Sequence, residues 1–470
     1  MANELKIEDE AVKKITAQQA FDWNILPIKI EDGFLHIATS SPSDKKLIED
    51  ISFFTGMKIK TTKMPSEIIL ERLKEVYGEN PVLTNGNGNQ SKVLQHEHSN
   101  VDLVNKIIDE AIENSASDIH LESYENNFRI RYRIDGQLRE IMNLPVSRSA
   151  QISSRLKIMA GLDISEKRKP QDGKIKYRNK SYDVDIRVST LPTSFGEKTV
   201  LRILDKSHLE LDVEKLGLAK DQQSVVLKNL QRPYGMILVT GPTGSGKSTS
   251  LYSFLNSIHR VEKNILTIED PIEYNIPGIN QCNVKPDIGF SFANALRSFL
   301  RQDPDIIMVG EIRDKETADI AVRAALTGHL VFSTLHTNDS ISAITRLIDM
   351  GVDAFLVAAS VKLIIAQRLV RKLCNCKSKT HSGSNGTQMN SFAKNGCFEC
   401  GMTGYKGRTA LFEIMEITED LAEMISSESS ITEIRNKAFE NGFLSLRQSG
   451  LSKIQLGITT NEEVIRETTL

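Results

Sequence analysis

The sequence predicts an α/β protein in which a parallel sheet has helices on both faces and is preceded by two smaller α/β domains. Three observations support this fold class. Apolar strand patterns and amphipathic helix patterns alternate over residues 206–373. A glycine-rich turn at residues 241–248 directly follows one of these strands and leads into a predicted helix. A polar segment at residues 80–100 separates two further mixed patterns, at residues 1–79 and 101–205.

The glycine-rich turn has the spacing of a phosphate-binding loop. The residues of this motif are Gly241, Pro242, Thr243, Gly244, Ser245, Gly246, Lys247, Ser248 and Thr249. Glycines permit backbone conformations that other residues avoid, so successive N–H groups can converge on a phosphate at the positive end of the next helix. Lys247 can then contact the β- and γ-phosphates of a nucleotide, and the Ser248 hydroxyl can bind Mg²⁺. A ligand-free turn is the alternative, but a chain of this length gives on the order of 0.02 chance matches.

The composition excludes several classes of protein. Of the 470 residues, 40% are hydrophobic, which is ordinary for a globular protein with a sizeable core. The 59 basic and 61 acidic residues leave a net charge of −2, which gives no bulk attraction to nucleic acid or anionic lipid. The sequence has neither a long apolar run nor an export signal, so we expect a cytoplasmic protein. In that compartment, clustered cysteines indicate a metal site rather than disulfides.

Residues 1–79 predict a small α/β domain with no visible chemistry, and its last helix is expected over residues 66–77. Residues 80–100 predict a flexible linker, because Asn, Gly, Gln and Ser dominate the segment. His96 and His98 lie in this linker without Cys or acidic partners at ligand spacing. We therefore interpret both histidines as solvated.

Residues 101–205 predict a second α/β domain. Apolar residues alternate with three arginines over residues 128–134, which is the pattern of a half-buried strand with a basic polar face. Such a face usually pairs with neighbouring carboxylates. Two further strands are expected at residues 182–188 and 199–204, and Arg202 lies in the apolar run of the second. Because burying an unpaired arginine is costly, Arg202 requires an anion, either a structural carboxylate or a nucleotide phosphate.

Acidic residues follow two apolar strands of the predicted parallel sheet. Glu269, Asp270 and Glu273 follow one strand, and Glu311 follows another. Ligands of open α/β sheets bind at the carboxyl ends of the strands, so these side chains are expected to bind Mg²⁺, directly or through water, and to orient the attacking water. They could instead be solubilising residues at strand ends. The sequence does not decide whether Glu269 or Glu311 is the base.

Two histidines bracket the next predicted strand. His329 precedes the strand, and His336 follows it. A structural role and a role in sensing the γ-phosphate are both compatible with a position beside a third parallel strand.

Several segments of the chain match the motifs of a known family. Four of them are GPTGSGKST at 241–249, TIEDPIEY at 267–274, RQDPDIIMVGEIRD at 301–314 and TGHLVFSTLHTN at 327–338. They resemble the Walker A, Asp-box, Walker B and His-box segments of the type II/type IV secretion ATPases. Residues 116–122, 187–193, 195–198 and 366–371 are similar to further segments of that family. The resemblance runs from about residue 101 to the C-terminus and is greatest to the pilus assembly (extension) ATPases and the type II secretion ATPases.

The resemblance implies a RecA-like nucleotide-binding core over residues 206–373 and a PAS-like domain over residues 101–205. It also implies ATP and Mg²⁺ as cofactors, and a cytoplasmic homo-hexamer that binds an inner-membrane platform protein. Association with the membrane would then be peripheral and would occur through partners only. In this family two arginines of the domain before the core reach the nucleotide across a domain or subunit boundary. Arg187 and Arg202 occupy the matching positions.

Two cysteine pairs bracket a polar loop within residues 374–400. The pairs are Cys374 with Cys376 and Cys397 with Cys400. Four thiolates are the ligands of a closed tetrahedral Zn²⁺ site, so we predict zinc. The first pair is C-x-C, whereas the family usually has C-x-x-C, and the shorter spacing leaves less slack for two sulfurs to reach one ion. Cys282 is isolated and is expected in the core. Residues 401–470 predict a C-terminal helical subdomain.

These observations together predict a motor ATPase that hydrolyses ATP and transmits subunit rotations to a pilus assembly platform. A pseudopilus ATPase of type II secretion is the alternative. The N-terminal domain and the cysteine cluster argue against a pilus retraction ATPase. A DNA translocase would require a basic, aromatic track, which 6% aromatic residues and a net charge of −2 do not support. Glu269 and Glu311 argue against a scaffold that binds nucleotide without turnover.

Overall fold

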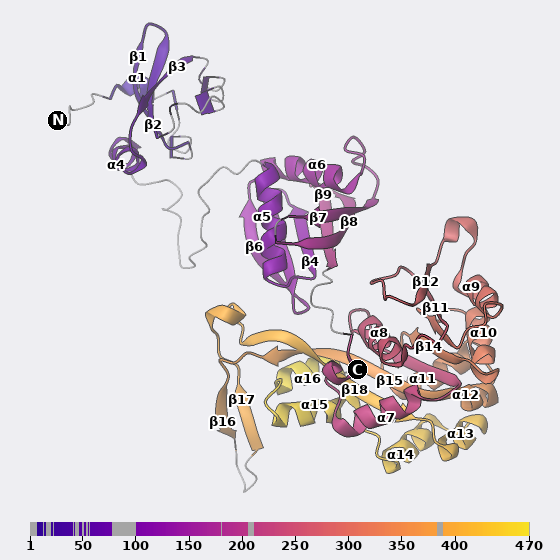
Figure 1. Ribbon diagram of the computed structural model, residues 1–470. Helices are drawn as coiled ribbons and strands as arrows, with labels where there is room; N and C mark the ends of the chain where they lie inside the picture. Colours follow the sequence, from indigo (N-terminus) through magenta and orange to yellow (C-terminus); the bar gives the residue numbers. More distant parts are fainter. Residues whose placement is uncertain are drawn as a thin grey trace. The chain divides into compact units, whose positions relative to one another are not determined.

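The computed structural model describes residues 7–12, 14–15, 20–21, 23–40, 42, 47–48, 51–52, 55, 57–77, 100–179, 181–204, 211–382 and 389–469. The chain divides into two compact units, Met1–Asn105 and Lys106–Leu470 (Figure 1). The predicted linker at residues 80–100 lies outside the described residues except for Asn100, and His96 and His98 lie outside them as well.

The first unit contains a three-stranded sheet in the order β1-β2-β3. Its elements are α1 (Asp9–Val12), β1 (Ile25–Glu31), β2 (Phe34–Thr39), β3 (Lys58–Lys63) and α4 (Ser66–Tyr77). Asp32 and Gly33 join the antiparallel strands β1 and β2, with the positive φ angles of 52° and 77° that a tight turn requires. Ile37, Ile69 and Leu73 are fully buried, so the sheet and α4 share one apolar core.

The second unit contains a six-stranded antiparallel sheet in the order β6-β5-β4-β9-β8-β7. Its elements are β4 (Asp118–Ser123), β5 (Phe128–Ile134), β6 (Gln137–Leu144), α6 (Ser149–Ala160), β7 (Gln171–Arg178), β8 (Asp183–Thr193) and β9 (Gly196–Leu204), and α5 (Asn100–Glu113) precedes them. β5 has the predicted bounds. Phe128, Ile130 and Tyr132 on this strand are buried, while the alternating arginines are half-buried.

The largest sheet has seven strands in the order β12-β11-β13-β14-β10-β15-β18. Neighbouring strands are parallel except at β15 and β18, which are antiparallel. The elements are α7 (Lys220–Leu230), β10 (Gly235–Thr240), α8 (Lys247–Ile258), β11 (Ile265–Glu269), β12 (Asn280–Asn283), α9 (Phe292–Phe299), β13 (Ile306–Val309), α10 (Lys315–Leu326), β14 (Leu330–Leu335), α11 (Ser340–Asp349), α12 (Ala354–Ser360), β15 (Val361–Leu373) and β18 (Tyr405–Glu416).

Alternate residues of the central strand β10 face two separate apolar cores. Met236 and Leu238 pack with residues of α9 to α12, while Ile237 and Val239 pack with residues of α7 and α8. All four side chains are fully buried. Because successive side chains of a strand point to opposite faces, this continuous apolar run belongs to a strand covered on both sides. The predicted parallel sheet with helices on both faces is confirmed.

The C-terminal part of the chain completes this sheet before it becomes helical. The hairpin β16 (Ser378–Ser382) and β17 (Met389–Ala393) follows β15. β18 then pairs along β15, so the start of the predicted helical subdomain belongs to the central sheet. The helices that follow are α13 (Glu419–Ser426), α14 (Ile431–Glu440), α15 (Leu446–Gln455) and α16 (Asn461–Thr468).

Candidate functional site

The phosphate loop connects the carboxyl end of β10 to the first residue of α8. Gly241 and Gly246 have φ angles of 148° and 89°, which favour glycine. A Cβ on Gly241 would lie 2.5 Å from the Gln367 carbonyl oxygen, and one on Gly246 would lie 2.8 Å from the Gln367 amide nitrogen. β15 therefore packs so closely against the loop that glycine is required at both positions. The Ser245 hydroxyl is buried and has no hydrogen-bond partner among the described residues.

The side chain of Lys247 lies over the phosphate loop. Its ammonium donates to the carbonyl oxygens of Gly241 and Pro242, at 2.8 and 3.0 Å. Burial lowers the pKa of Lys247, while the charge of the Glu311 carboxylate opposes that shift. A phosphate can replace these two hydrogen bonds, because it offers the ammonium a full negative charge whereas the carbonyl oxygens are neutral.

Glu311 and His336 meet at the same edge of the sheet, as strand positions predict. Glu311 follows β13 after one residue, and its side chain is 12% exposed. A carboxylate oxygen of Glu311 lies 3.3 Å from Nε2 of His336, which follows β14, and 2.5 Å from Nε of Arg313. The Arg313 contact was not anticipated, although the residue stands two positions after Glu311 in the sequence.

Glu269 is more deeply enclosed than Glu311. This last residue of β11 is 5% exposed. Its carboxylate accepts hydrogen bonds from the Thr267 hydroxyl at 2.6 Å, from the Gln281 amide at 3.0 Å and from the Tyr252 hydroxyl. Burial and the neighbouring carboxylate raise the pKa of Tyr252. Both carboxylate oxygens of Glu269 therefore already have donors within the chain.

The two arginines singled out in the sequence contact carboxylates of the same chain. Arg187 donates to the Glu273 carboxylate at 3.0 Å and to the Ile272 carbonyl at 3.3 Å. Arg202 donates to the Asp118 carboxylate at 3.0 Å. Asp118 is thus the anionic partner that the sequence required for Arg202, although the Arg202 side chain is 58% exposed rather than buried in the apolar run. The alternation of a strand explains this, because the flanking residues Leu201 and Ile203 point to the other face.

His329 does not lie at the phosphate loop of its own chain. It precedes β14, and its carbonyl oxygen accepts from the N–H of Gly235, the first residue of β10. The phosphate loop follows the opposite end of β10, and a strand of six residues spans about 20 Å. Within one chain His329 therefore lies at the edge opposite the phosphate loop, because parallel strands all begin at that edge.

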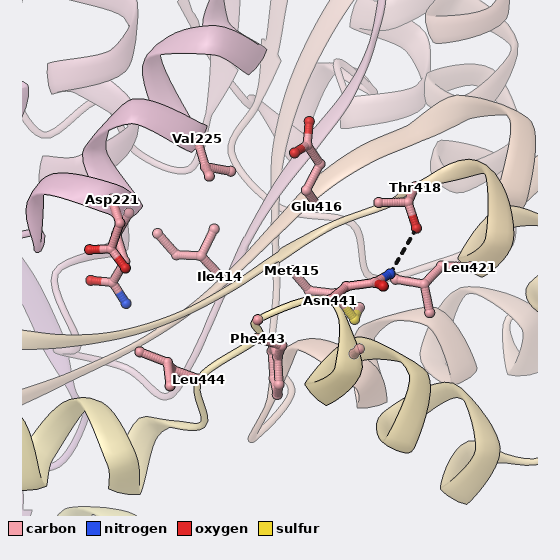
Figure 2. Close-up of a pocket in the computed structure, with 13 residues that line it drawn as sticks. Asp221, Val225, Ile414, Met415, Glu416, Thr418, Leu421, Asn441, Phe443 and Leu444 are labelled. Carbon is pink, nitrogen blue, oxygen red and sulfur yellow. Dashed lines mark hydrogen bonds between the residues drawn. The ribbon is translucent and has the colours of Figure 1, made fainter.

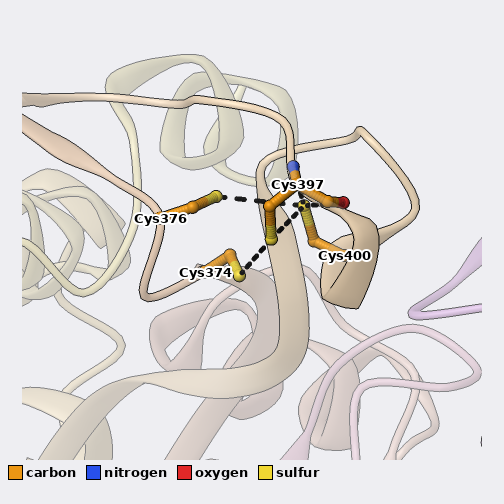
Figure 3. Close-up of side chains that lie close together, drawn as sticks. All are labelled: Cys374, Cys376, Cys397 and Cys400. Carbon is orange, nitrogen blue, oxygen red and sulfur yellow. Dashed lines mark hydrogen bonds between the residues drawn. The ribbon is translucent and has the colours of Figure 1, made fainter.

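The four cysteines converge from two segments (Figure 3). All four sulfur atoms lie within 4.8 Å of one another. The Cys374–Cys397, Cys376–Cys400 and Cys397–Cys400 sulfurs are 3.7, 4.0 and 3.6 Å apart. Four sulfurs at 2.3 Å from a tetrahedral ion would be about 3.8 Å apart. The three separations are close to this value, and the sulfurs of the C-x-C pair lie within 4.8 Å of each other. Cys282 lies separately on β12, partly buried beside the apolar core.

A cavity of about 240 Å³ lies away from these groups (Figure 2). It opens between α7, β18 and the α13–α14 segment, where Asp221 and Glu416 line it together with apolar residues. Asn441 donates to the Thr418 hydroxyl at 3.2 Å across its wall. The cavity contains none of the site residues that the sequence predicts.

In the part of the chain that the structure describes, no helix is both long enough and apolar enough to cross a membrane.

Comparisons with known proteins place these observations in a family. Residues 94–466 match the family model described as type II/IV secretion system protein, and residues 2–82 match the MshEN domain model. The type IV pilus assembly ATPase PilB of Myxococcus xanthus is 45% identical, over 98% of this chain and 87% of its own length. The type II secretion system ATPase E of Vibrio cholerae is 47% identical, over 78% of this chain and 75% of its own length.

Solved structures agree with the fold. The pilus retraction motor PilT with bound ADP has a TM-score of 0.54 and 29% sequence identity. The match covers 78% of this chain and 96% of that chain. The predicted RecA-like core is therefore confirmed at the level of the fold.

Proposed function

Because the chain belongs to the type II/IV secretion system protein family, we propose that it is a motor ATPase that drives type IV pilus assembly. The observation that carries the proposal is the charged edge of the parallel sheet. Lys247 begins α8 after β10, and Glu311 follows β13, so both lie at the carboxyl edge of the sheet, where the carboxylate opposes the lowering of the Lys247 pKa. This is the charge arrangement that nucleotide hydrolysis at a phosphate loop needs.

Each side chain at this edge has a role in the proposed reaction. The loop N–H groups and Lys247 bind the phosphates, and Ser248 holds Mg²⁺, which neutralises charge on the phosphate oxygens. Glu311 orients the attacking water, and its contact with His336 holds the carboxylate in place. Both oxygens of the Glu269 carboxylate accept hydrogen bonds, and through the bond from Tyr252 this side chain orders the residues around it. The close approach of Gln367 to Gly241 and Gly246 favours a tight phosphate cradle.

The biological setting follows from the relatives. The pilus assembly relative matches 98% of this chain, whereas the type II secretion relative matches 78%, which favours pilus assembly over pseudopilus assembly. We propose a cytoplasmic homo-hexamer that is recruited to an inner-membrane platform protein by protein contacts. A retraction ATPase and a DNA translocase remain the less favoured alternatives. Deletion of the gene separates the two leading roles. Loss of surface pili would support pilus assembly, and loss of secretion of a type II substrate would support the alternative.

The catalytic assignment is tested by three single variants. Glu311→Gln keeps the shape of the side chain but loses its charge, so ATP binding should persist while turnover falls by roughly 10² or more. Lys247→Ala should weaken ATP binding itself. Glu316→Gln is the matched control, because this exposed carboxylate on α10 pairs only with Arg297 among the described residues. Purified Glu311→Gln with wild-type ATPase activity would remove Glu311 from the mechanism.

We also propose that the four cysteines bind one structural Zn²⁺. The sulfur separations of 3.6 to 4.0 Å support this, since they match the edges of a tetrahedral site. Purified protein should contain about one zinc per chain by elemental analysis. The Cys397→Ser/Cys400→Ser variant should lose the metal and exchange amide hydrogens faster around residues 374–404. Cys282→Ser should retain zinc. A zinc-free wild type whose stability survives prolonged chelation would contradict the proposal.

A further inference from the structure

Arg368 is a buried arginine beside the phosphate loop. It lies on β15, which pairs with β10 as far as Thr240 and Ala366 and then extends beyond the end of β10. Arg368 is therefore level with the start of the phosphate loop, and its side chain is 6% exposed. Gln367 points to the opposite face, where it accepts from the Ser250 hydroxyl of α8 at 2.7 Å.

The Arg368 guanidinium joins three parts of the site. One nitrogen donates to the Gln367 carbonyl at 3.1 Å and lies 3.2 Å from where a Cβ on Gly241 would be. The other donates to the carbonyl and side-chain oxygens of Asn338, at 2.8 and 3.3 Å. Asn338 follows His336 by two residues, so the guanidinium contacts both the phosphate loop and the segment that positions His336 beside Glu311.

The charge of Arg368 has no ion-pair partner within the described residues, and the carboxylates of Glu467, Glu413 and Asp339 act on it only from a longer distance. No carboxylate oxygen of that part of the chain lies within 4.0 Å of its nitrogens. A buried arginine without a carboxylate is costly, and burial accordingly lowers its pKa. Its charge also lowers the pKa of Lys247. The site thus holds a buried cation, Arg368, and a partly buried one, Lys247, and the Glu311 carboxylate opposes the lowering of the Lys247 pKa.

We propose that Arg368 is a positioning residue of the ATPase site, which couples the phosphate loop to the His336–Glu311 pair. A bound polyphosphate brings further negative charge to Arg368, which has no direct carboxylate partner among the described residues. The planar guanidinium then holds Gln367 and Asn338 at once, which keeps His336 directed at Glu311. The inference rests on the proposed function, because it assigns Arg368 to the site built around Lys247 and Glu311.

Conservative and neutral substitutions separate charge from geometry. Arg368→Lys keeps the charge but cannot bridge both oxygen acceptors as a planar fork does, so the Kd for ATP should stay within about threefold while kcat falls on the order of 10- to 100-fold. Arg368→Gln loses the charge as well, and its Kd should rise by about tenfold. Nucleotide binding, kcat and KM are measured on the full chain, together with the melting temperature.

Arg371→Lys on the same strand is the matched control. Arg371 is also 6% exposed, but it pairs with the Glu463 carboxylate at 2.6 Å and stacks on Tyr405. This variant should melt earlier and keep the kcat and KM of its folded fraction. If Arg368→Gln does not fold, Arg368→Lys alone decides the question.

The inference is overturned if Arg368→Lys keeps wild-type kcat, or if it loses activity only in proportion to unfolded protein, as the Arg371 control would. An inactive Glu311→Gln together with a fully active Arg368→Lys would reject the role of Arg368 and leave the proposed function intact. An active Glu311→Gln would instead reject the site itself.

Discussion

Two charged clusters of the second unit are built in opposite ways. In the antiparallel sheet, the buried Glu122 carboxylate on β4 meets Arg129 at 3.3 Å, Arg131 at 2.8 Å and Lys198 at 3.1 Å. The neighbouring Asp118 carboxylate likewise pairs with two arginines. Every arginine of the predicted basic face on β5 therefore has a carboxylate partner, which confirms the interpretation that such a face is structural.

At the phosphate loop the cations lack this compensation. Lys247 and Arg368 donate to neutral oxygens of their own chain, and no ion pair of either is found in the described portion of the protein. The same residue types therefore serve folding where carboxylates contact them directly, and they can serve a ligand where no carboxylate does. Removing a charge should consequently damage stability in the first cluster and chemistry in the second.

Arg187 connects the two regions and gives the largest expected effect. It lies on β8 beside Arg202, yet its partner Glu273 follows β11 of the core. If Arg187 and Arg202 complete the site of a neighbouring subunit, Arg187→Ala/Arg202→Ala should lower ATPase activity by roughly 10³-fold. Mixing this variant with inactive Glu311→Gln should restore some activity, because mixed rings contain interfaces where intact arginines face an intact Glu311.

The recovered activity should also depend on protein concentration, since the rings must exchange subunits. If mixed hexamers form without any recovery, or if the double arginine variant unfolds, the role in trans should be abandoned. Arg187 and Arg202 would then belong with the structural cluster of β4.

The next largest effect is expected from Glu122. Glu122→Gln leaves three cations around a neutral amide, which should destabilise the antiparallel sheet by about 2 kcal/mol. Protection factors of β4 and β5 amides should then fall by about 30-fold in hydrogen exchange, while the Kd for ATP remains unchanged. Glu140→Gln is the control, because this carboxylate is 51% exposed and lies 3.9 Å from Arg129. If both variants lower the protection factors equally, the buried Glu122 carboxylate has no greater structural role than the exposed Glu140 carboxylate.

The parts predicted from the sequence are those that depend on local patterns. The spacing of residues 241–249 identified the phosphate loop, and the rule that ligands bind at the carboxyl ends of parallel strands brought Glu311 and His336 together. The same rule, applied to both ends of β14, would have placed His329 at the edge opposite the phosphate loop of its own chain. The alternation of β9 would have shown that Arg202 is exposed.

The contacts that the sequence did not predict join residues that are distant in the chain and meet only in the folded structure. Arg368 meets Asn338, a residue 30 positions away, only because β15 passes beside the loop that follows β14. Tyr252 reaches Glu269 from the interior of α8. Arg368 and Glu122 are both buried, and each has a partner from a segment that is distant in the sequence. Such contacts require the register of strands that are distant in the chain.

The smallest expected effect is a change in acid sensitivity. Burial alone would raise the pKa of Glu122, but hydrogen bonds from Arg131 and Lys198 outweigh it and lower the pKa to about 2, against an ordinary value of 4.5. A group whose pKa is lower in the folded state stabilises that state above its unfolded pKa, and this contribution is lost as pH falls towards the folded pKa. The stabilisation by Glu122 should thus be complete above about pH 5 and should decline towards pH 2.

Other carboxylates titrate over the same range, so the informative quantity is the difference between wild type and Glu122→Gln. Protection factors of β4 amides in the two proteins should differ most at pH 5 to 6, and the difference should narrow as pH falls to 3, because only the wild type has a charge to lose at this position. Glu140→Gln should follow the wild type at every pH. A gap that stays constant down to pH 3 would mean that Glu122 acts through packing rather than charge, and the contrast between the two clusters would then no longer rest on charge.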